Sequence, residues 1–212
     1  DQGQHDGNHD VLAVSTAGAL IRRDVFEELG GLDPNLTLFR DDVDFGWRAR
    51  AAGHSVLVAT GAVAFHAQAS ANERRIVEVD GAFLHRPLLL DRRNAAYVLL
   101  ANSSWWMLPW LVIQLLGTAV ARSIGYLIAK LPGYAADEIL AVGAVIVKPG
   151  SIIAARKVRK KQRFVSARVI AEFIPPRWSQ IRLASEGFVE AIRSKLFPEN
   201  NQINTPSVLD AN

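Results

Sequence analysis

Apolar and polar positions alternate over short distances in the first third of the chain. Apolar residues gather at 11–23 (VLAVSTAGALIRR), at 54–60 (HSVLVAT) and at 62–67 (AVAFHA). Runs of this length, bounded by glycine and polar residues, predict short buried strands. The small residues at 15–18 of the first run would let another group approach the backbone closely.

Two helices are predicted between these strands, so the fold class expected for this part is α/β. Asp24 precedes the apolar-acidic stretch VFEEL and can cap a short helix that ends at the glycine pair 30–31. A second helix is expected to begin near Asp41–Asp44, to bury Trp47 and to stop at Gly53.

The character of the chain changes at Ala95. Residues 95–121 form a run of 27 residues without a charge, and a membrane-spanning helix needs roughly 20 mostly apolar residues. Three tryptophans lie inside the run. If they sit at the headgroup level, the span shifts to Met107–Leu131 and contains Arg122. Both registers are open from the sequence.

A second apolar segment covers residues 138–155 and is interrupted by Lys-Pro-Gly at 148–150. It is either a short second pass or a helix that lies in the membrane interface. After Phe164 the chain has an amphipathic piece at 177–197 and then a polar end that is expected to be loop.

Charge indicates the kind of surface that the chain meets. The net charge is +3 and the pI is about 9.4, but the basic residues lie beside the apolar segments, which favours a membrane surface over nucleic acid. Both flanks of the apolar region are basic, so the positive-inside tendency places both in the cytoplasm. The basic residues of the flanks are Arg86, Arg92, Arg93, Arg156, Lys157, Arg159, Lys160, Lys161 and Arg163.

Three aspartates, Asp41, Asp42 and Asp44, stand at the start of the second predicted helix. One interpretation is structural, because backbone N–H groups and the helix dipole favour carboxylates at a helix start. The other is chemical, with the carboxylates handling a proton or a metal ion. The chain has no cysteine, so Cys-ligated zinc and disulfides are excluded, and His66 is the histidine that follows this helix and the next predicted strand.

The order of these features resembles the C-terminal half of the catalytic domain of family 2 glycosyltransferases, which have the GT-A fold. That family has a small-residue strand and then an RRxxFxxxGGFD stretch. An acidic helix of the pattern E/D-D-x-D-hydrophobic-x-x-R follows, then a glycine before a strand, and later a histidine. The matching residues here are Gly18, Arg22, Arg23, Phe26, Gly30, Gly31, Leu32, Asp33, Asp41, Asp42, Asp44, Arg48, Gly53 and His66. The apolar and basic segments that follow resemble large bacterial members anchored in membranes.

The resemblance implies roles for the acidic helix. Asp42 matches the family's catalytic base, which takes the proton of the acceptor hydroxyl in an inverting transfer. Asp41 would orient the acceptor. Asp44 is expected either to bind substrate or to cap the helix and pair with Arg48, with which it shares a face at this spacing.

Further roles follow from the same resemblance. Gly18 and its small neighbours would line the substrate floor, and Trp47 would stack on a sugar or fill the core. His66 matches a position where some members hold a divalent metal, Mn²⁺ or Mg²⁺, and imidazole suits Mn²⁺ better.

One part of the family pattern has no counterpart. The nucleotide-binding βαβ unit and its D-x-D motif should precede Asp1, and the opening DQGQHDGNHD does not supply them. We therefore expect a fragment that lacks the donor-binding half, with most metal ligands in that half, and that is inactive alone.

The predicted function is transfer of a sugar from a nucleotide-activated donor to a cell-envelope glycan or lipid-linked acceptor at the bacterial cell membrane, with the catalytic part facing the cytoplasm and membrane lipids as further partners. Two alternatives remain: a non-catalytic membrane-associated scaffold whose acidic helix is only capped, and a metal-dependent hydrolase. The expected division is a partial GT-A domain (1–85), membrane-associated helices (86–163), and an amphipathic helix with a polar tail (164–212).

Overall fold

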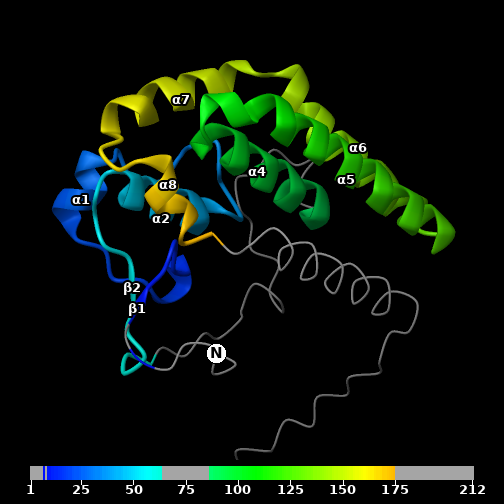
Figure 1. The fold of residues 1–212 in the computed structure, drawn as a ribbon. Helices are drawn as coiled ribbons and strands as arrows, with labels where there is room; N and C mark the ends of the chain where they lie inside the picture. Colours follow the sequence, from blue (N-terminus) through cyan, green and yellow to red (C-terminus); the bar gives the residue numbers. More distant parts are fainter. Residues whose placement is uncertain (1–6, 8, 64–85, 175–212) are drawn as a thin grey trace, which may run out of the picture. The chain divides into compact units, whose positions relative to one another are not determined.

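Helices make up most of the backbone that this computed structural model describes, which covers residues 7, 9–63 and 86–174 (Figure 1). Residues 1–175 form one compact unit and residues 176–212 a second. The longer helices of the first unit are α1 (Arg23–Glu28), α2 (Asp41–Ala51), α4 (Pro87–Asn102), α5 (Leu108–Ile128), α6 (Pro132–Val147), α7 (Gly150–Gln162) and α8 (Ala167–Ala171).

The sheet in the described residues is small. β1 (His9–Asp10) pairs antiparallel with β2 (Leu57–Val58), with His9 opposite Val58. The strand expected over 11–23 is wrong: β1 ends at Asp10, the N–H of Val11 makes one more bond to the carbonyl of Val56, and the chain then turns into a 3₁₀ helix at Thr16–Gly18. There the Ser15 hydroxyl accepts the N–H of Ala17, a local bond that competes with strand pairing. A partial GT-A fold is therefore not confirmed, although α/β elements are present.

The two short helices form where predicted, but Asp24 does not cap the first: it lies inside α1, whose N-cap is Arg22 without a side-chain cap. Gly30 and Gly31, which follow α1, have φ of +75° and +73°, and Gly53, which follows α2, has φ of +95°. Glycine adopts these left-handed angles without a side-chain clash. The N–H of His54 then returns to the carbonyl of Ala49 at 2.9 Å, which closes the end of α2.

The long uncharged run is not one helix. α4 ends at Asn102, and after Ser103-Ser104 a 3₁₀ turn at Trp105–Met107 leads into α5. The 24 residues Trp105–Ile128 are long and apolar enough to cross a membrane, and only 22% of the most apolar stretch is buried inside the protein. α6 and α7 pass the same test only as a pair that bends by 63° at Pro149. The structure thus favours the later of the two predicted registers.

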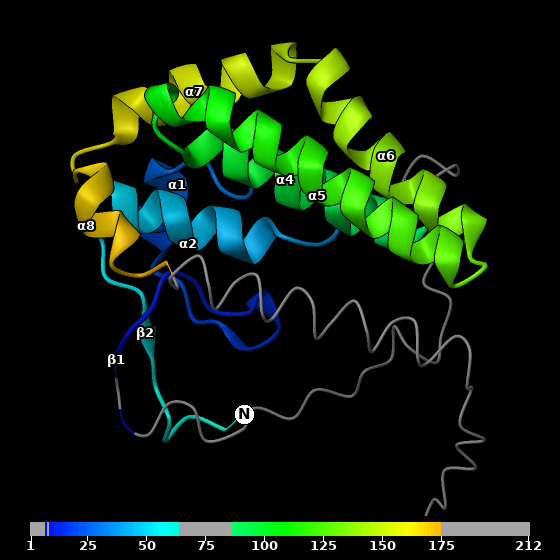
Figure 2. The same cartoon turned by 45° about the vertical axis from the view of Figure 1, so that its right-hand side comes forward.

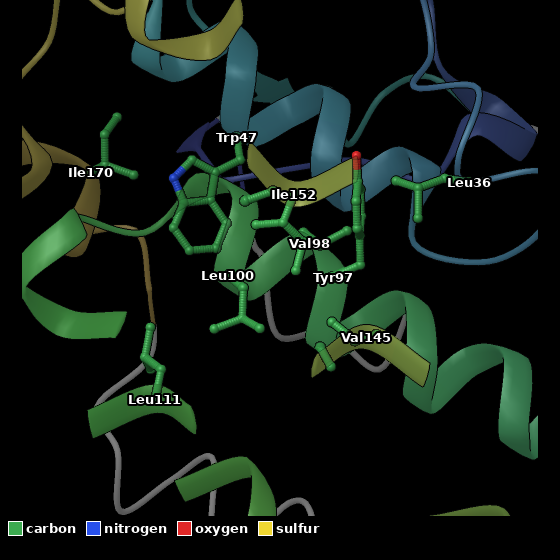
Figure 3. Packing of buried hydrophobic residues seen from close by; sticks show 11 residues of the cluster. Leu36, Trp47, Tyr97, Val98, Leu100, Leu111, Val145, Ile152 and Ile170 are labelled. Carbon is green, nitrogen blue, oxygen red and sulfur yellow. The ribbon is translucent and has the colours of Figure 1, made fainter. Parts of the chain in front are cut away.

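Helix α2 lies between the β1–β2 ribbon and a layer formed by α4, α5, α6 and α7, and both views agree on this order (Figures 1 and 2). The largest apolar cluster fills the contact. It joins Leu36 and Trp47 to residues of α4 through α8, and Figure 3 shows the Trp47 indole among Val98, Leu100 and Ile152. Trp47 is 9% exposed. Its position in the core agrees with one of the two predictions, and the other, stacking on a sugar, stays untested.

The predicted charge inside the apolar region has a partner. Arg122 of α5 and Arg92 of α4 both approach the carboxylate of Glu138 on α6, at 3.7 Å and 3.0 Å. Glu138 is 1% exposed. A buried carboxylate is tolerated when charged donors surround it, so the α4–α5–α6 bundle accounts for Arg122.

The expected boundary after residue 85 falls inside the first compact unit. Residues of the N-terminal part and of the apolar helices share the Trp47 cluster. The boundary expected after residue 163 also falls inside it, since Ile170 of α8 packs in the same cluster. The amphipathic piece at 177–197 lies outside the described residues.

Candidate functional site

A pocket of about 380 Å³ lies along one face of α2. Its opposite walls come from the irregular segment after β1, from α1 and from the start of β2. Phe45, Gly46 and Ala49 of α2 form the apolar floor, and Arg22 and His54 add polar groups. The lining is about equally polar and apolar, and a concave site of this size falls in the range of small-ligand pockets.

Asp42 lines this pocket from the first turn of α2. Its side chain is partly buried, and one carboxylate oxygen accepts the N–H of Val43 at 2.7 Å. The N–H groups of the first turn have no carbonyl partner within the helix. A negative charge at this end is therefore favoured. The carboxylate is held against the helix start while it faces the pocket.

Helix α4 holds the loop that leads into Asp41 and Asp42. Phe39 and Arg40 have φ of +64° and +67°, left-handed angles that cost energy for residues with side chains. The amide of Asn94, which is fully buried, donates to the carbonyls of Leu38 and Phe39 at 2.5 Å and 3.1 Å. These bonds fix the backbone that aims the acidic turn.

An ion pair secures the same loop from outside. Arg40 donates to both oxygens of Asp91 on α4, at 2.7 Å and 3.1 Å. The hydrogen bond to Asp91 raises the pKa of Arg40 above its ordinary value, and the charges of Asp91 and Asp42 add to this against the opposing effect of burial. A permanent cation thus stands beside the acidic turn.

Asp44 is wholly buried and its carboxylate is used inside the protein. One oxygen accepts from Arg48 at 2.7 Å, and the other accepts from Asn102 and from Arg159, both at 2.8 Å. The predicted pairing with Arg48 is confirmed. The substrate-binding role expected for Asp44 gains no support from this geometry, in which the carboxylate is fully buried, and stays a prediction.

Arg159 of α7 joins this buried network to Asp33. Its Nη2 lies 2.7 Å from the Asp33 carboxylate, which also accepts the hydroxyl of Tyr97 at 2.8 Å. Burial opposes the ionisation of Asp33, but hydrogen bonds from Asn35 and Tyr97 and the charge of Arg159 outweigh it and lower its pKa. Burial and the bond to Asp33 raise the pKa of Tyr97. The network ties α2 to α4 and α7.

Arg48 links the two short helices. Its other two nitrogens donate to the carbonyls of Leu29 and Gly31, at 2.9 Å and 2.8 Å. These carbonyls follow α1, where the helix leaves its own acceptors unpaired. The glycine pair and the arginine four positions after Asp44 therefore form one structural unit.

The remaining predicted site residues are only partly brought together. Asp41 is partly buried but does not line the pocket. Gly18 is exposed in the 3₁₀ turn, and its neighbours Thr16 and Ala19 line the pocket instead. His66 lies outside the described residues, so its distance from Asp42 stays untested.

A metal site does not follow from the described part of the chain. Residues 7, 9–63 and 86–174 bring together no group of three or more histidine, aspartate or glutamate side chains that could hold an ion. Two neighbouring carboxylates at a helix start are too few ligands for Mn²⁺ or Mg²⁺. The role that we propose for Asp42 therefore involves no metal ion.

Sequence reasoning missed the residues of α4 and α7 that hold the site. Asn94 and Arg159 are separated from the acidic turn by more than fifty residues. Arg159 stands among Arg156, Lys157, Lys160 and Lys161 in a basic run of α7, so the sequence did not distinguish it from its neighbours. Asn94 carried no signal either, since an amide inside a helix has no distinctive spacing.

Residues 1–78 match the family model described as glycosyltransferase like family 2. This part of the chain is related to glycosyltransferase family 2. The match includes β1, α1, α2 and β2 and therefore the whole pocket that Asp42 lines. At family level, the relationship supports a glycosyltransferase-type enzyme and sugar transfer in general. No curated protein and no solved structure matches the chain significantly.

Proposed function

We propose that the pocket beside α2 takes the acceptor of an inverting sugar transfer and that Asp42 is the general base. The observation that carries the proposal is the position of Asp42, whose side chain lines a pocket of about 380 Å³ within the residues that match family 2. A base must reach the proton that it removes, and a partly buried carboxylate at the wall of a pocket satisfies that need.

The proposed reaction is a single displacement at the anomeric carbon of the donor sugar. The acceptor hydroxyl gives its proton to a carboxylate oxygen of Asp42, and its oxygen forms a bond to the anomeric carbon of the donor sugar. The bond from that carbon to the nucleoside diphosphate breaks, and the diphosphate leaves with the electron pair. Aspartate is a weak base near neutral pH, so most of the rate gain comes from positioning.

The contacts of α4 support this positioning role. Asn94 and Asp91 hold the loop before Asp41, while the Asp44 network fixes the next turn of α2. These contacts hold the backbone on both sides of Asp42, while its side chain lines the pocket. Orientation of the acceptor by Asp41, one residue earlier on the same turn, rests on the family resemblance, because Asp41 does not line the pocket.

Membrane association is the second part of the proposal. One helix is long and apolar enough to cross a membrane, and its exposed apolar side chains recur every three or four residues. Those side chains are Trp110, Ile113, Leu116, Val120, Ile124 and Leu127. A stripe of this kind without a protein partner in the described residues suits contact with lipid chains.

We further propose that the site faces the cytoplasm of a bacterial cell and that the acceptor is a cell-envelope glycan or a lipid-linked glycan. Basic residues on both sides of the apolar helices favour cytoplasmic flanks. Nucleotide sugars, the donors of this chemistry, would then meet the site directly. The divalent metal expected with His66 stays a prediction.

The test is Asp42→Asn in the protein as the cell makes it, assayed for sugar transfer in membranes. Loss of a general base lowers rates about 10²- to 10⁴-fold, so kcat should fall at least about 100-fold with little change in KM. The matched control is Glu27→Gln, which also removes one carboxylate but lies on the exposed face of α1. Unchanged transfer by a folded Asp42→Asn protein would remove Asp42 from the mechanism and favour the scaffold alternative.

A further inference from the structure

A second and larger pocket, of about 840 Å³, lies among the helices that follow residue 86. Its walls come from the end of α4, the turn at Trp105–Met107, the start of α5, and the junction of α6 with α7. Much of the wall is apolar, with Trp106, Val112, Ile146 and Ile153 among the lining residues. The bend at Pro149 separates α6 from α7 and leaves this space between them.

The rest of the lining is cationic. No aspartate or glutamate lines the pocket, and the five charged residues that do are Arg156, Lys157, Arg159, Lys160 and Arg163. Among the described residues, Arg159 is the one member of this set with an ion pair to a carboxylate. The positive charge of the pocket is therefore largely uncompensated by carboxylates.

Backbone carbonyls, and not carboxylates, hold the other two arginines of the pocket. Arg156 donates to the carbonyls of Leu100 and Ser103, and Arg163 donates to the carbonyl of Asn102. These bonds complete the end of α4 and fix both guanidinium groups at the pocket. Carbonyl oxygens satisfy the donors without neutralising the charge. Burial and the charge of Arg159 lower the pKa of Arg163, as expected for crowded cations.

Arg159 lies at the wall of the pocket, but its guanidinium serves the buried network with Asp33 and Asp44. Its side chain is 6% exposed and lines the pocket, and its Nη1 has no hydrogen-bond partner among the described residues. A buried charged donor left without an acceptor is costly. This nitrogen is shielded from solvent, so the charge that the pocket offers to a ligand comes from the four other cations, Arg156, Lys157, Lys160 and Arg163.

We propose that this pocket binds the phosphate headgroup of an anionic membrane lipid, whose hydrocarbon chain lies along the apolar wall. The cations suit a phosphate, and the apolar wall has no use in binding a free phosphate or a nucleic acid backbone. The mouth adjoins Trp105 and Trp106, which are 78% and 66% exposed and belong to the candidate span. Such tryptophans favour the headgroup level.

The site rests on the membrane association proposed above but not on sugar transfer. The experiment titrates the purified full chain, in one detergent, with short-chain phosphatidic acid and with phosphatidylcholine of the same chain length. Binding is measured by isothermal titration calorimetry. Wild type should bind the acid saturably and in preference to phosphatidylcholine. Asp42→Asn should bind phosphatidic acid as well as wild type does. Loss of sugar transfer and loss of lipid binding can therefore be told apart.

Two adjacent lysines give the matched pair. Lys160 lines the pocket and Lys161 does not, and both are exposed on α7, so neither change should disturb folding. Lys160→Gln should weaken binding of phosphatidic acid about fivefold, since one basic residue near a lipid phosphate contributes roughly 1 kcal/mol. Lys161→Gln should leave the affinity unchanged.

The apolar wall is tested with Ile153→Asn, which should weaken binding of the lipid while leaving any binding of inorganic phosphate unchanged. Equal losses in Lys160→Gln and Lys161→Gln would mean nonspecific attraction and overturn the proposal. So would competition by inorganic phosphate at the affinity of the lipid, displacement by a short single-stranded oligonucleotide, or the absence of saturable binding.

Discussion

Replacing Arg159 by methionine tests whether the helical layer and the acidic helix are one structural body. The guanidinium bridges Asp33 and Asp44, at 2.7 Å and 2.8 Å, from a helix more than a hundred residues away in sequence. Methionine keeps much of the side-chain volume and removes the charge. The packing against Tyr97, whose ring lies 5.6 Å from the guanidinium carbon, is largely retained.

The expected cost follows from the carboxylates that remain. Asp44 is wholly buried and Asp33 is 10% exposed, and removing one partner of a buried ion pair costs about 3–5 kcal/mol. Asp44 keeps Arg48 and Asn102 and Asp33 keeps Tyr97 and Asn35, so we expect the lower end, about 3 kcal/mol. At roughly 2–4 °C per kcal/mol for a chain of this length, the Tm should fall by about 6–12 °C.

The measurement is denaturant and thermal unfolding of the purified chain in a mild detergent. Lys161→Met is the control, because it removes a neighbouring charge on α7 that is exposed and lacks an ion pair among the described residues. Its effect should stay within about 0.5 kcal/mol. Asp44→Asn combined with Arg159→Met should cost less than the sum of the two single changes, since the two side chains are in contact.

A loss of less than about 1 kcal/mol in Arg159→Met would refute the reasoning, since that is the range of an exposed pair. It would mean that the network contributes little and that α7 is held by the apolar cluster alone. Strict additivity of the double change would lead to the same conclusion.

Gly46→Ala should destabilise the protein by about 2 kcal/mol in urea unfolding, because an added Cβ would lie 2.5 Å from the carbonyl oxygen of Leu12. Gly143→Ala, where an added Cβ meets nothing within 4 Å, should be neutral or stabilising, and equal effects would contradict this. The lowered pKa of Asp33 predicts stability that is fully present above its unfolded value of about 3.9 and is lost as pH falls through the lower folded value. Urea unfolding at decreasing pH should show this loss below about pH 4, and Asp33→Asn should remove that part of the acid dependence; an unchanged dependence would argue against it.

Local features of the sequence predicted the elements around the acidic helix well. Gly30, Gly31 and Gly53 mark helix ends because left-handed angles exclude most other residues. The spacing of Asp44 and Arg48 predicted their ion pair because positions four apart share a helix face. These signals depend only on neighbours in the chain.

Most of the features that failed depend on distant contacts. Nothing near Asp44 indicates that Asn102 and Arg159 occupy its second oxygen and close it to solvent. The run at 95–121 has no charge, but Asn102, Ser103, Ser104 and Pro109 interrupt its apolar residues. These residues lie where α4 ends and α5 begins, so the break had a local signal that the absence of charge concealed. Asp42 could be singled out from the sequence, but the pocket that it lines could not.

The shared Trp47 cluster has a practical and a mechanical consequence. A truncation before Pro87, intended to yield a readily handled catalytic piece, would strip the indole and the Asp44 carboxylate of their cover and leave a piece prone to aggregate. In the intact chain, the acidic turn and α5 belong to the same compact unit. If α5 crosses a membrane as proposed, the fold itself acts as the spacer that sets how far Asp42 stands from the headgroups.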